Sequence, residues 1–307
     1  MSTPINLSQN TSSPSSDYQK LLLPGMMLSM FCWGLSWTSG KVLSHYGAAT
    51  EITFYRFAFT VLSLLFILPL FRVKWTISRR GLPSLLITSV LMTAYSVLFF
   101  KGLLQGYAGA GGVLVTTLCP VMSYVIMLLL ARRLPDKQET LGIVLGLVAA
   151  CLLLNLIADW QKVFESGNVY FLLAAFIWAI ISLLTARTEK YGSPLTFSLW
   201  LYLLSVLQVM FLIDSQKIFH IAQQADGLFW GNLFFSATIT TALATSFYFY
   251  ITTQLGASRA SSFIFLVPTS AALGAWVFLG EVPNLHTITG GLVGITAVYV
   301  LNKKTNV

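Results

Sequence analysis

The chain alternates between long apolar runs and short polar segments. Ten runs of near-uniform length can be traced, with approximate bounds at 21–43, 50–71, 82–101, 108–131, 139–157, 168–187, 194–213, 228–251, 258–280 and 285–301. Each has about the 20 residues that a helix needs to cross the hydrocarbon layer of a bilayer. The connecting segments are too short to form a domain outside the membrane. The pattern therefore predicts an all-α polytopic membrane protein with ten transmembrane helices.

A stretch near the middle of the chain returns close to its end. Residues 120–146 read PVMSYVIMLLLARRLPDKQETLGIVLG, and residues 268–294 read PTSAALGAWVFLGEVPNLHTITGGLVG. Without a gap, the spacing of 148 aligns Pro120 with Pro268, Pro135 with Pro283, Gly142 with Gly290 and Gly146 with Gly294. Trp33 and Trp178 match at a spacing of 145, and three extra residues between the seventh and eighth runs explain the change. Such internal self-similarity predicts two copies of one module.

Each copy holds five predicted helices, so the second has to enter the membrane in the opposite sense to the first. Placing both termini in the cytoplasm puts 13 Lys and Arg residues on the inner side and three on the outer side, as the positive-inside rule requires. Arg133, at an inner helix end, is matched by Glu281 at an outer one. The predicted organisation is a disordered cytoplasmic tail at 1–20 and inverted modules at 21–157 and 168–304.

Composition agrees with this class and excludes others. The chain is 56% hydrophobic and 9% charged, whereas a soluble domain has about 25% charged residues. The net charge of +8 comes from short loops between apolar runs and does not indicate a nucleic-acid surface. The three cysteines lie in apolar runs without metal-type spacing. The sequence has no HExxH or Walker motif, so we expect neither an enzyme nor a cofactor or metal site.

Several short motifs resemble the EamA modules of the drug/metabolite transporter superfamily. They are Trp33-Gly34, Lys41, Arg56, Pro120 and Leu141-Gly142 in the first copy, and Pro268 and Leu279-Gly280-Glu281 in the second. The first copy departs from the family at Ala131-Arg132-Arg133, where many modules carry Gly-Glu, and the second at Trp178-Ala179, where Trp-Gly is usual. The resemblance covers nearly the whole chain after residue 20. It implies a ten-helix exporter-like fold in a bacterial inner membrane, and it does not imply a substrate.

Charged residues within apolar runs are the first candidates for a functional site, because each costs about 2.5–3.5 kcal/mol on insertion scales. Arg56 lies well inside the second run, where it could bind a substrate carboxylate, pair with Glu51 or backbone carbonyls, or reach outward. Lys41 and Glu51 are candidates for an outer vestibule or for coupling to protons. The structural alternatives are that Lys41 extends to the interface and that Glu51 interacts with its helix N-terminus.

Aromatic residues at mid-run are the second group of candidates. Trp33 and Trp37 lie one helical turn apart on one face, and Trp178 repeats Trp33 in the second module. Because interfacial tryptophans gather at span ends, these positions favour a cavity wall, with ordinary packing or lipid contact as the alternative. The predicted substrate-binding set is Trp33, Trp37, Arg56, Tyr95, Phe99, Trp178, Phe247, Tyr248 and Trp276. Pro120 and Pro268 are expected to kink their helices.

These features predict a secondary transporter, since inverted repeats around a midplane site are the usual architecture of alternating access. The expected cargo is a small metabolite, amino acid or amphipathic or aromatic compound, and export is the favoured direction. An importer or exchanger of the same fold is the first alternative. A membrane-embedded lipid-handling protein or enzyme is the alternative from another class. Proton coupling is left open, as is the choice between monomer and homodimer.

Overall fold

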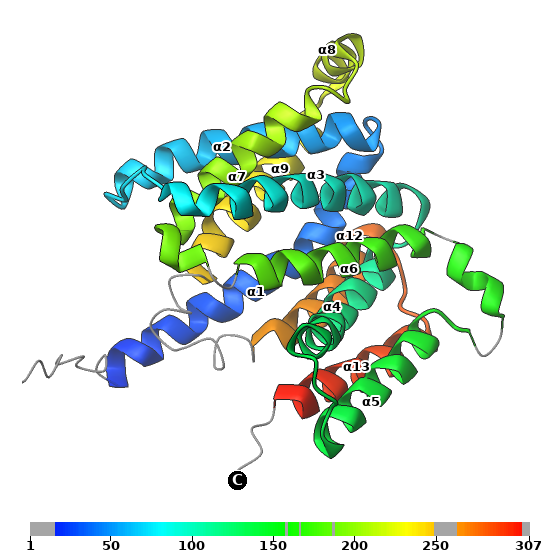
Figure 1. Cartoon of the computed structure of the whole chain (residues 1–307). Coiled ribbons are helices and arrows are strands. Elements are labelled where there is room, and N and C mark those ends of the chain that lie inside the picture. Colours follow the sequence, from blue (N-terminus) through cyan, green and yellow to red (C-terminus); the bar gives the residue numbers. More distant parts are fainter. Residues whose placement is uncertain (1–15, 157–158, 166, 186–187, 249–262, 303–307) are drawn as a thin grey trace, which may run out of the picture.

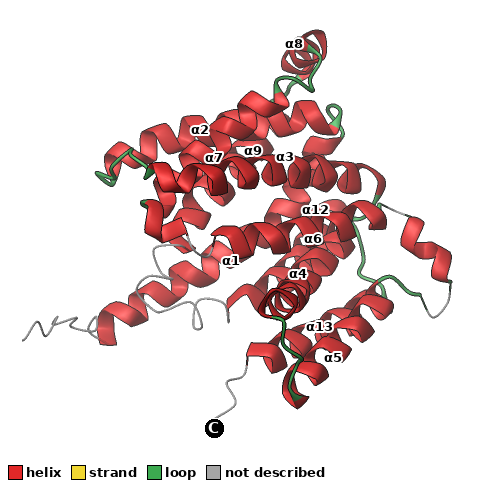
Figure 2. Ribbon diagram, in the orientation of Figure 1, coloured by secondary structure: helices red, strands yellow, loops and turns green. Residues whose placement is uncertain are grey.

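The described residues of the protein are helical throughout. The computed structural model describes residues 16–156, 159–165, 167–185, 188–248 and 263–302, in which no strand occurs (Figure 1, Figure 2). The helices are α1 (Ser16–Ser44), α2 (Ala49–Leu70), η1 (Arg79–Gly81), α3 (Leu82–Gln105), α4 (Ala108–Ala131), α5 (Lys137–Leu153), η2 (Trp160–Phe164), α6 (Asn168–Thr185), η3 (Thr188–Tyr191), α7 (Pro194–Val209), α8 (Ser215–Gln224), α9 (Gly227–Phe234), η4 (Phe235–Ala244), η5 (Phe263–Phe265), α12 (Leu266–Leu279) and α13 (Leu285–Asn302).

Many helices have the length and surface of membrane spans. Within the described residues, five stretches are long and apolar enough to cross a bilayer, namely Ala49–Leu70, Arg79–Gln105, Ala108–Ala131, Asn168–Thr185 and Gly227–Tyr248, and α7, α12 and α13 are shorter apolar helices. Large apolar side chains point away from the bundle, such as Phe66 at 79% and Leu130 at 76% exposed. Surfaces of this kind suit lipid, and helices suit it because their backbone hydrogen bonds are satisfied internally.

The seventh predicted run is shorter than expected and is followed by a separate helix. The run was placed at 194–213, whereas α7 ends at Val209. The chain then turns at Asp214, whose Oδ1 accepts a hydrogen bond from the backbone N–H of Gln216 at 2.9 Å and so begins α8. Figure 1 shows α8 at the top edge of the molecule, above α2. Residues 249–262, which include the end of the eighth predicted run and the start of the ninth, lie outside the described residues.

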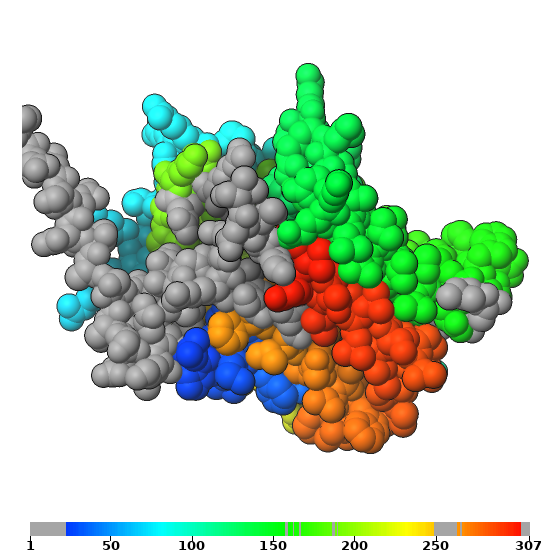
Figure 3. Space-filling view, turned by 90° about the horizontal axis from the view of Figure 1, so that it is seen from below, coloured from blue at the N-terminus to red at the C-terminus, as the bar shows by residue number. Residues whose placement is uncertain are grey.

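Helices α5 and α13 pack closely through glycines. A Cβ on Gly142 would lie 2.6 Å from Leu301 Cγ, and a Cβ on Gly290 would lie 2.8 Å from Leu153 Cγ. The two contacts are repeat equivalents, because Gly142 corresponds to Gly290 and Leu153 to Leu301 at the spacing of 148. Figure 3 shows α13, in red, directly against the green segment around α5. The GxxxG spacing therefore serves close helix packing inside this molecule.

Helices α2 and α7 meet at residues that occupy the same place in the two copies. Phe57 and Tyr202 are 145 positions apart, and their ring centroids lie 5.3 Å from each other. Both side chains are buried in one apolar cluster that also includes Leu64 and Leu201. The centre of the molecule is thus formed by matching positions of the two copies.

Candidate functional site

Arg56 is the central feature of the candidate site. Its guanidinium carbon lies 5.3 Å from the ring centroid of Phe99 and 5.9 Å from that of Phe100, within range of cation–π attraction. Nη2 donates a long hydrogen bond of 3.4 Å to Thr241 Oγ1. Nε is buried and has no hydrogen-bond partner among the described residues, where Arg56 also forms no ion pair. The cation is thus held in place by rings and a hydroxyl while part of its donor capacity is unused.

Glu51 does not neutralise this cation. The Glu51 side chain is only 2% exposed, and its Oε2 accepts a hydrogen bond from Thr50 Oγ1 at 2.7 Å. Its Oε1 accepts a long one, 3.4 Å, from the backbone N–H of Asp214. The Arg56–Glu51 pair, one of the structural alternatives for Arg56, is therefore not formed.

Four of the predicted site residues come together around Arg56 from different helices. The rings of Tyr95 on α3 and Trp178 on α6 lie 4.7 Å apart, and Tyr95 and Phe99 lie 6.0 Å apart. Trp37 on α1 packs edge-on against Phe99 at 4.8 Å. Trp37 is almost fully buried and also contacts the core ring of Phe171, so its surroundings are those of a packing residue.

The remaining predicted aromatics lie elsewhere. Trp33, Phe247 and Tyr248 belong to a second cluster at the middle of α1, in which Trp33 and Tyr248 lie 5.2 Å apart. Trp33 Nε1 donates to Thr245 Oγ1 at 3.2 Å. Trp276 is 51% exposed on α12 and takes part in no ring contact with the described residues. The structure therefore divides the predicted set into two clusters and one outward-facing residue.

The two predicted kink residues lie near each other. Pro120 in α4 and Pro268 in α12 line one small cavity of about 10 Å³, together with Thr116 and Gly294. A space of this size holds at most one water molecule. The prolines therefore shape the contact between these helices and do not line a space for a solute in this conformation.

A π-helical segment, η4, carries the hydroxyl groups that meet the site residues. Thr240 and Thr241 donate to carbonyls five residues earlier, at 3.1 Å and 2.7 Å, as the wide π turn permits. Thr241 also accepts from Arg56, and Thr245, directly after η4, accepts from Trp33. π segments are rare and are frequent at functional sites. The signal in the sequence is the run TITTALAT within an otherwise apolar span, and none of its residues was among the predicted site residues.

At the predicted outer end, one polar contact joins the two copies. Tyr46 Oη donates to Asp226 Oδ1 at 2.6 Å, and the Tyr46 ring lies 5.0 Å from Phe229. The pKa of Asp226 is lowered because its carboxylate accepts hydrogen bonds from Tyr46 and from the backbone N–H of Phe229. The pKa of Tyr46 is raised because Asp226 holds its hydroxyl proton.

At the opposite end, the matching positions are also in contact. Tyr191 is the repeat partner of Tyr46 at a spacing of 145, and Ser78 is the partner of Asp226 at 148. The backbone N–H of Ser78 donates to the carbonyl of Tyr191 at 2.8 Å. Gly81, the partner of Phe229, lies directly against the Tyr191 ring. The two ends of the molecule thus carry contacts between equivalent positions. The contact at the Tyr46 end includes the carboxylate of Asp226, whereas the contact at the Tyr191 end is a backbone hydrogen bond from Ser78.

An open cavity of about 510 Å³ lies beside the outer contact. Its polar lining comes from Lys41, His45, Tyr46 and Glu281. Lys41 Nζ donates to two backbone carbonyls, of Leu103 at 2.5 Å and Gly106 at 2.9 Å. Glu281 Oε2 accepts from the backbone N–H of Gly109 at 2.9 Å. Lys41 therefore lines the cavity while its ammonium group ties α1 to the end of α3.

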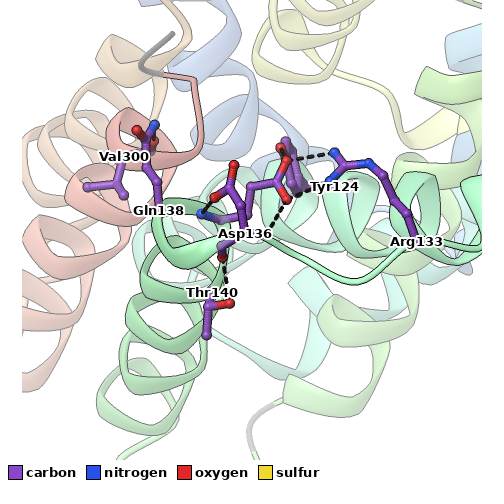
Figure 4. Close-up of polar contacts among 7 residues, drawn as sticks. Tyr124, Arg133, Asp136, Gln138, Thr140 and Val300 are labelled. Carbon is purple, nitrogen blue, oxygen red and sulfur yellow. Dashed lines mark hydrogen bonds and ion pairs between the residues drawn. The ribbon is translucent and has the colours of Figure 1, made fainter. Parts of the chain in front are cut away.

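The predicted inner end of α4 is connected to α5 by a charged network (Figure 4). Arg133 donates through Nη1 and Nη2 to the two carboxylate oxygens of Glu139, at 2.7 Å and 2.6 Å. Tyr124 Oη donates to the same carboxylate. Glu139 also completes a capping box with Asp136, in which each side chain accepts from the other's backbone N–H at 2.8 Å. Arg133, predicted only as a topology signal, thus has a structural partner.

Comparisons with known proteins decide the family. A model of the EamA-like transporter family matches the chain twice, over residues 21–155 and 165–303. The chain belongs to this family. "Uncharacterized transporter YoaV" of Bacillus subtilis (strain 168) is 25% identical over 283 residues, which span 90% of this EamA protein and 94% of YoaV. A solved crystal structure with 15% identity superposes with a TM-score of 0.59 over 90% of this chain and 95% of its own, which shows a shared fold.

A third relative has a more specific name. The "Probable terminal-alkyne amino-acid exporter" of Streptantibioticus cattleyicolor is 23% identical over 233 residues, 74% of this chain and 75% of that protein. The two family matches and these relatives make this EamA protein a multi-pass membrane transporter. The resemblance inferred from the short motifs is therefore confirmed.

Proposed function

We propose that this EamA transporter works by alternating access between two inverted modules, at 21–157 and 168–304. The observation that carries the proposal is the pair of equivalent contacts at the two ends. Tyr46 meets Asp226 at one end, and the repeat partners Tyr191 and Ser78 meet at the other. Each contact joins one module to the other, so breaking one while the other holds would open the site to one side only.

The packing inside the bundle supports the same arrangement. The Gly142–Leu301 and Gly290–Leu153 contacts exchange when the two copies are exchanged, as a two-fold axis in the membrane plane requires. The Phe57–Tyr202 contact joins equivalent positions and would lie on that axis. With five spans in each module, equivalent residues then face opposite sides of the membrane.

The cargo in this proposal is a small metabolite, amino acid or amphipathic or aromatic compound bound between the modules. Arg56, Tyr95, Phe99 and Trp178 would form its site, which Thr241 of the second module completes. Export across a bacterial inner membrane, with both termini in the cytoplasm, fits the distribution of basic residues and the name of the Streptantibioticus relative. Glu51, buried at the outer end, is the candidate group for proton coupling.

Flux measurements test this proposal. The purified protein is reconstituted in liposomes, and uptake of radiolabelled amino acids and aromatic amines is measured with and without a pH gradient. We expect saturable flux of at least one solute, with a gradient dependence that reports coupling. Folded, correctly inserted protein that moves none of them would contradict the proposal. Efflux slower than uptake under equal gradients would favour import over export.

A cysteine pair provides the control for alternating access. Tyr46→Cys and Asp226→Cys are combined in a background from which Cys32, Cys119 and Cys151 are removed. Bridging the two cysteines with a short bifunctional reagent that forms a disulfide with each thiol should stop flux, and reduction of these disulfides should restore it. Undiminished flux through the bridged protein would argue for a channel, because a fixed pore does not need the modules to separate.

A further inference from the structure

We propose that the cargo of this transporter carries a carboxylate and that Arg56 binds it, with the apolar part of the cargo against Phe99 and Trp178. This inference rests on the proposed transport function and names the chemical class of its substrate. It is carried by three observations on Arg56: the residue at its repeat position, its unused donors and the rings around it.

The second module shows what the fold alone requires at this position. The repeat partner of Arg56 is Leu201, at the spacing of 145 that also relates Phe57 to Tyr202. Leu201 is 4% exposed and packs in the central apolar cluster. An apolar side chain therefore satisfies the packing at the equivalent place, and the helix contact between α2 and α7 does not explain a cation there.

The protein leaves part of the Arg56 guanidinium without a partner. Nε is buried and makes no hydrogen bond with the described residues, and the Nη2 bond to Thr241 is long at 3.4 Å. A guanidinium offers its N–H groups as a planar fork that matches the two oxygens of a carboxylate. A carboxylate bound side-on would satisfy Nε and one terminal nitrogen together. Such a ligand would supply the negative charge and the hydrogen-bond acceptors that the protein does not provide to Arg56.

The surroundings favour an apolar monoanion over a phosphate ester. Phe99 and Phe100 cover the guanidinium, and the Tyr95–Trp178 pair continues the aromatic surface. A phosphate monoester carries a charge between about −1.5 and −2 at neutral pH. The described residues bring one cation to this site, which balances a single carboxylate. An aromatic or aliphatic monocarboxylic acid fits both the charge and the rings.

A matched ligand series tests the inference directly. Binding of phenylpropanoate, phenylpropanamide and phenylpropylamine to the purified transporter is measured by calorimetry, with indole analogues as a second scaffold and phenyl phosphate as an added anion. Because hydrogen bonds to charged groups are among the strongest, the acid should bind about tenfold or more tightly than the amide. Arg56→Leu, which installs the residue of the second module, and Arg56→Gln should bring that ratio to within about twofold.

Control variants and measurements distinguish a loss of carboxylate recognition from a loss of folding and from a loss of transport. Arg80→Gln removes the same charge at an exposed position and should keep the full preference for the acid, and thermal unfolding should show that all variants are folded. The inference is overturned if the wild type binds the amide or amine as tightly as the acid, prefers phenyl phosphate, or binds no probe, or if Arg56→Leu keeps the preference. Flux of the amine in liposomes alongside such a result would leave transport standing and reject only the anionic cargo.

Discussion

At the scale of single residues, the buried polar groups differ in whether the protein itself supplies their partners. Lys41 donates to two carbonyls, and Glu139 accepts from Arg133 and Tyr124. Arg56 has rings and one long hydrogen bond instead. The sequence predicted which residues lie in the apolar runs. It could not predict their partners, because most of these lie on other helices and their proximity depends on helix rotation.

The same argument explains the divided aromatic set. A mid-run position places a side chain at a given depth of the bilayer, and the repeat relates Trp33 to Trp178 at similar depths. Depth does not determine the direction in which a residue faces around the helix. Trp276, which was predicted only to extend the cavity wall formed by the repeated tryptophans, points outward at 51% exposure.

The Tyr46–Asp226 contact leads to the first prediction. Tyr46→Phe removes the hydrogen bond and should make the outer end open more often. A cysteine at Ser39, a buried position on α1, reports this opening through labelling by a membrane-impermeant thiol reagent, with Cys151 replaced. We expect labelling to rise roughly two- to fivefold, a modest effect for an exposed hydrogen bond. Tyr107→Phe, at an exposed tyrosine, should change nothing.

The same contact predicts a pH dependence. The pKa of Asp226 is lowered in the folded protein, so its contribution is complete above about pH 4, near the unfolded value, and is lost as the pH falls through the folded value. The pKa of Tyr46 is raised, so its contribution is complete below about pH 10 and is lost as the pH rises through the folded value. At each pH the labelling rate of the Ser39 cysteine is divided by the rate of the same cysteine in the Tyr46→Phe background, because the thiolate fraction itself rises with pH and cancels in this ratio. The ratio should therefore stay constant between pH 5 and 9. A change in the ratio within that range would assign the contact to other groups.

At the scale of helices, the sequence predicted the long elements and did not predict α8 or the π segment η4. Within the described residues, the apolar runs other than the ninth correspond to helices of similar bounds, because a membrane span is specified by length and hydrophobicity alone. Helix α8 was missed because its ten residues, SQKIFHIAQQ, are too polar for a span and begin at an Asp cap that only local geometry reveals. The π segment was missed because a period of 3.6 was assumed throughout the eighth span.

The close packing of α5 and α13 gives a prediction on helix contacts. A Cβ on Gly290 would lie 2.9 Å from the backbone nitrogen of Leu153, whereas a Cβ on Gly142 meets a movable side chain. Gly290→Ala should therefore destabilise the protein more than Gly142→Ala, by about 1–3 kcal/mol. Thermal unfolding in detergent measures both. Gly231→Ala, where nothing lies within 4 Å, is the control, and equal shifts at all three positions would contradict the packing account.

The capping box at the start of α5 gives a further prediction on stability. Glu139→Ala removes the acceptor of the Asp136 backbone N–H and the partner of Arg133, and should cost about 0.5–2 kcal/mol of stability. Lys137→Gln, at an exposed neighbour in the same turn, should cost little. The unfolding midpoints of the two variants are measured side by side. A lower midpoint for Glu139→Ala than for Lys137→Gln would show that the network stabilises the protein, and equal midpoints would show that it does not.

At the scale of the whole molecule, the repeat was the most informative signal in the sequence. The spacing of 148 related Gly142 to Gly290 before any contact was known, and both glycines lie at one helix interface. Other whole-molecule features lay beyond the pattern, above all the clustering of contacts between modules at both ends. Those contacts join segments such as the α1–α2 loop and the start of α9, whose proximity follows only from the assembled bundle.

Orientation in the membrane is predicted at the same scale. With 13 basic residues on one side against three on the other, both termini should face the cytoplasm. A fluorescent protein fused after Val307 should fluoresce in bacterial cells, and alkaline phosphatase fused there should be inactive. The opposite pair of results would reverse the membrane orientation while leaving the fold unchanged.

The π segment has a consequence for motion. Its repeat counterpart in α3 is an ordinary α-helix, so of these two equivalent helices only the one in the second module is wound into wide turns. Tightening one wide turn to α geometry would turn the following stretch by about 100° relative to the preceding one. We expect such a change to let the half of the helix at Thr245 rotate while the half at Asp226 stays in place. The two modules, alike in sequence pattern, therefore differ in helix geometry, and the one with the π segment holds the hydroxyl that accepts from Arg56.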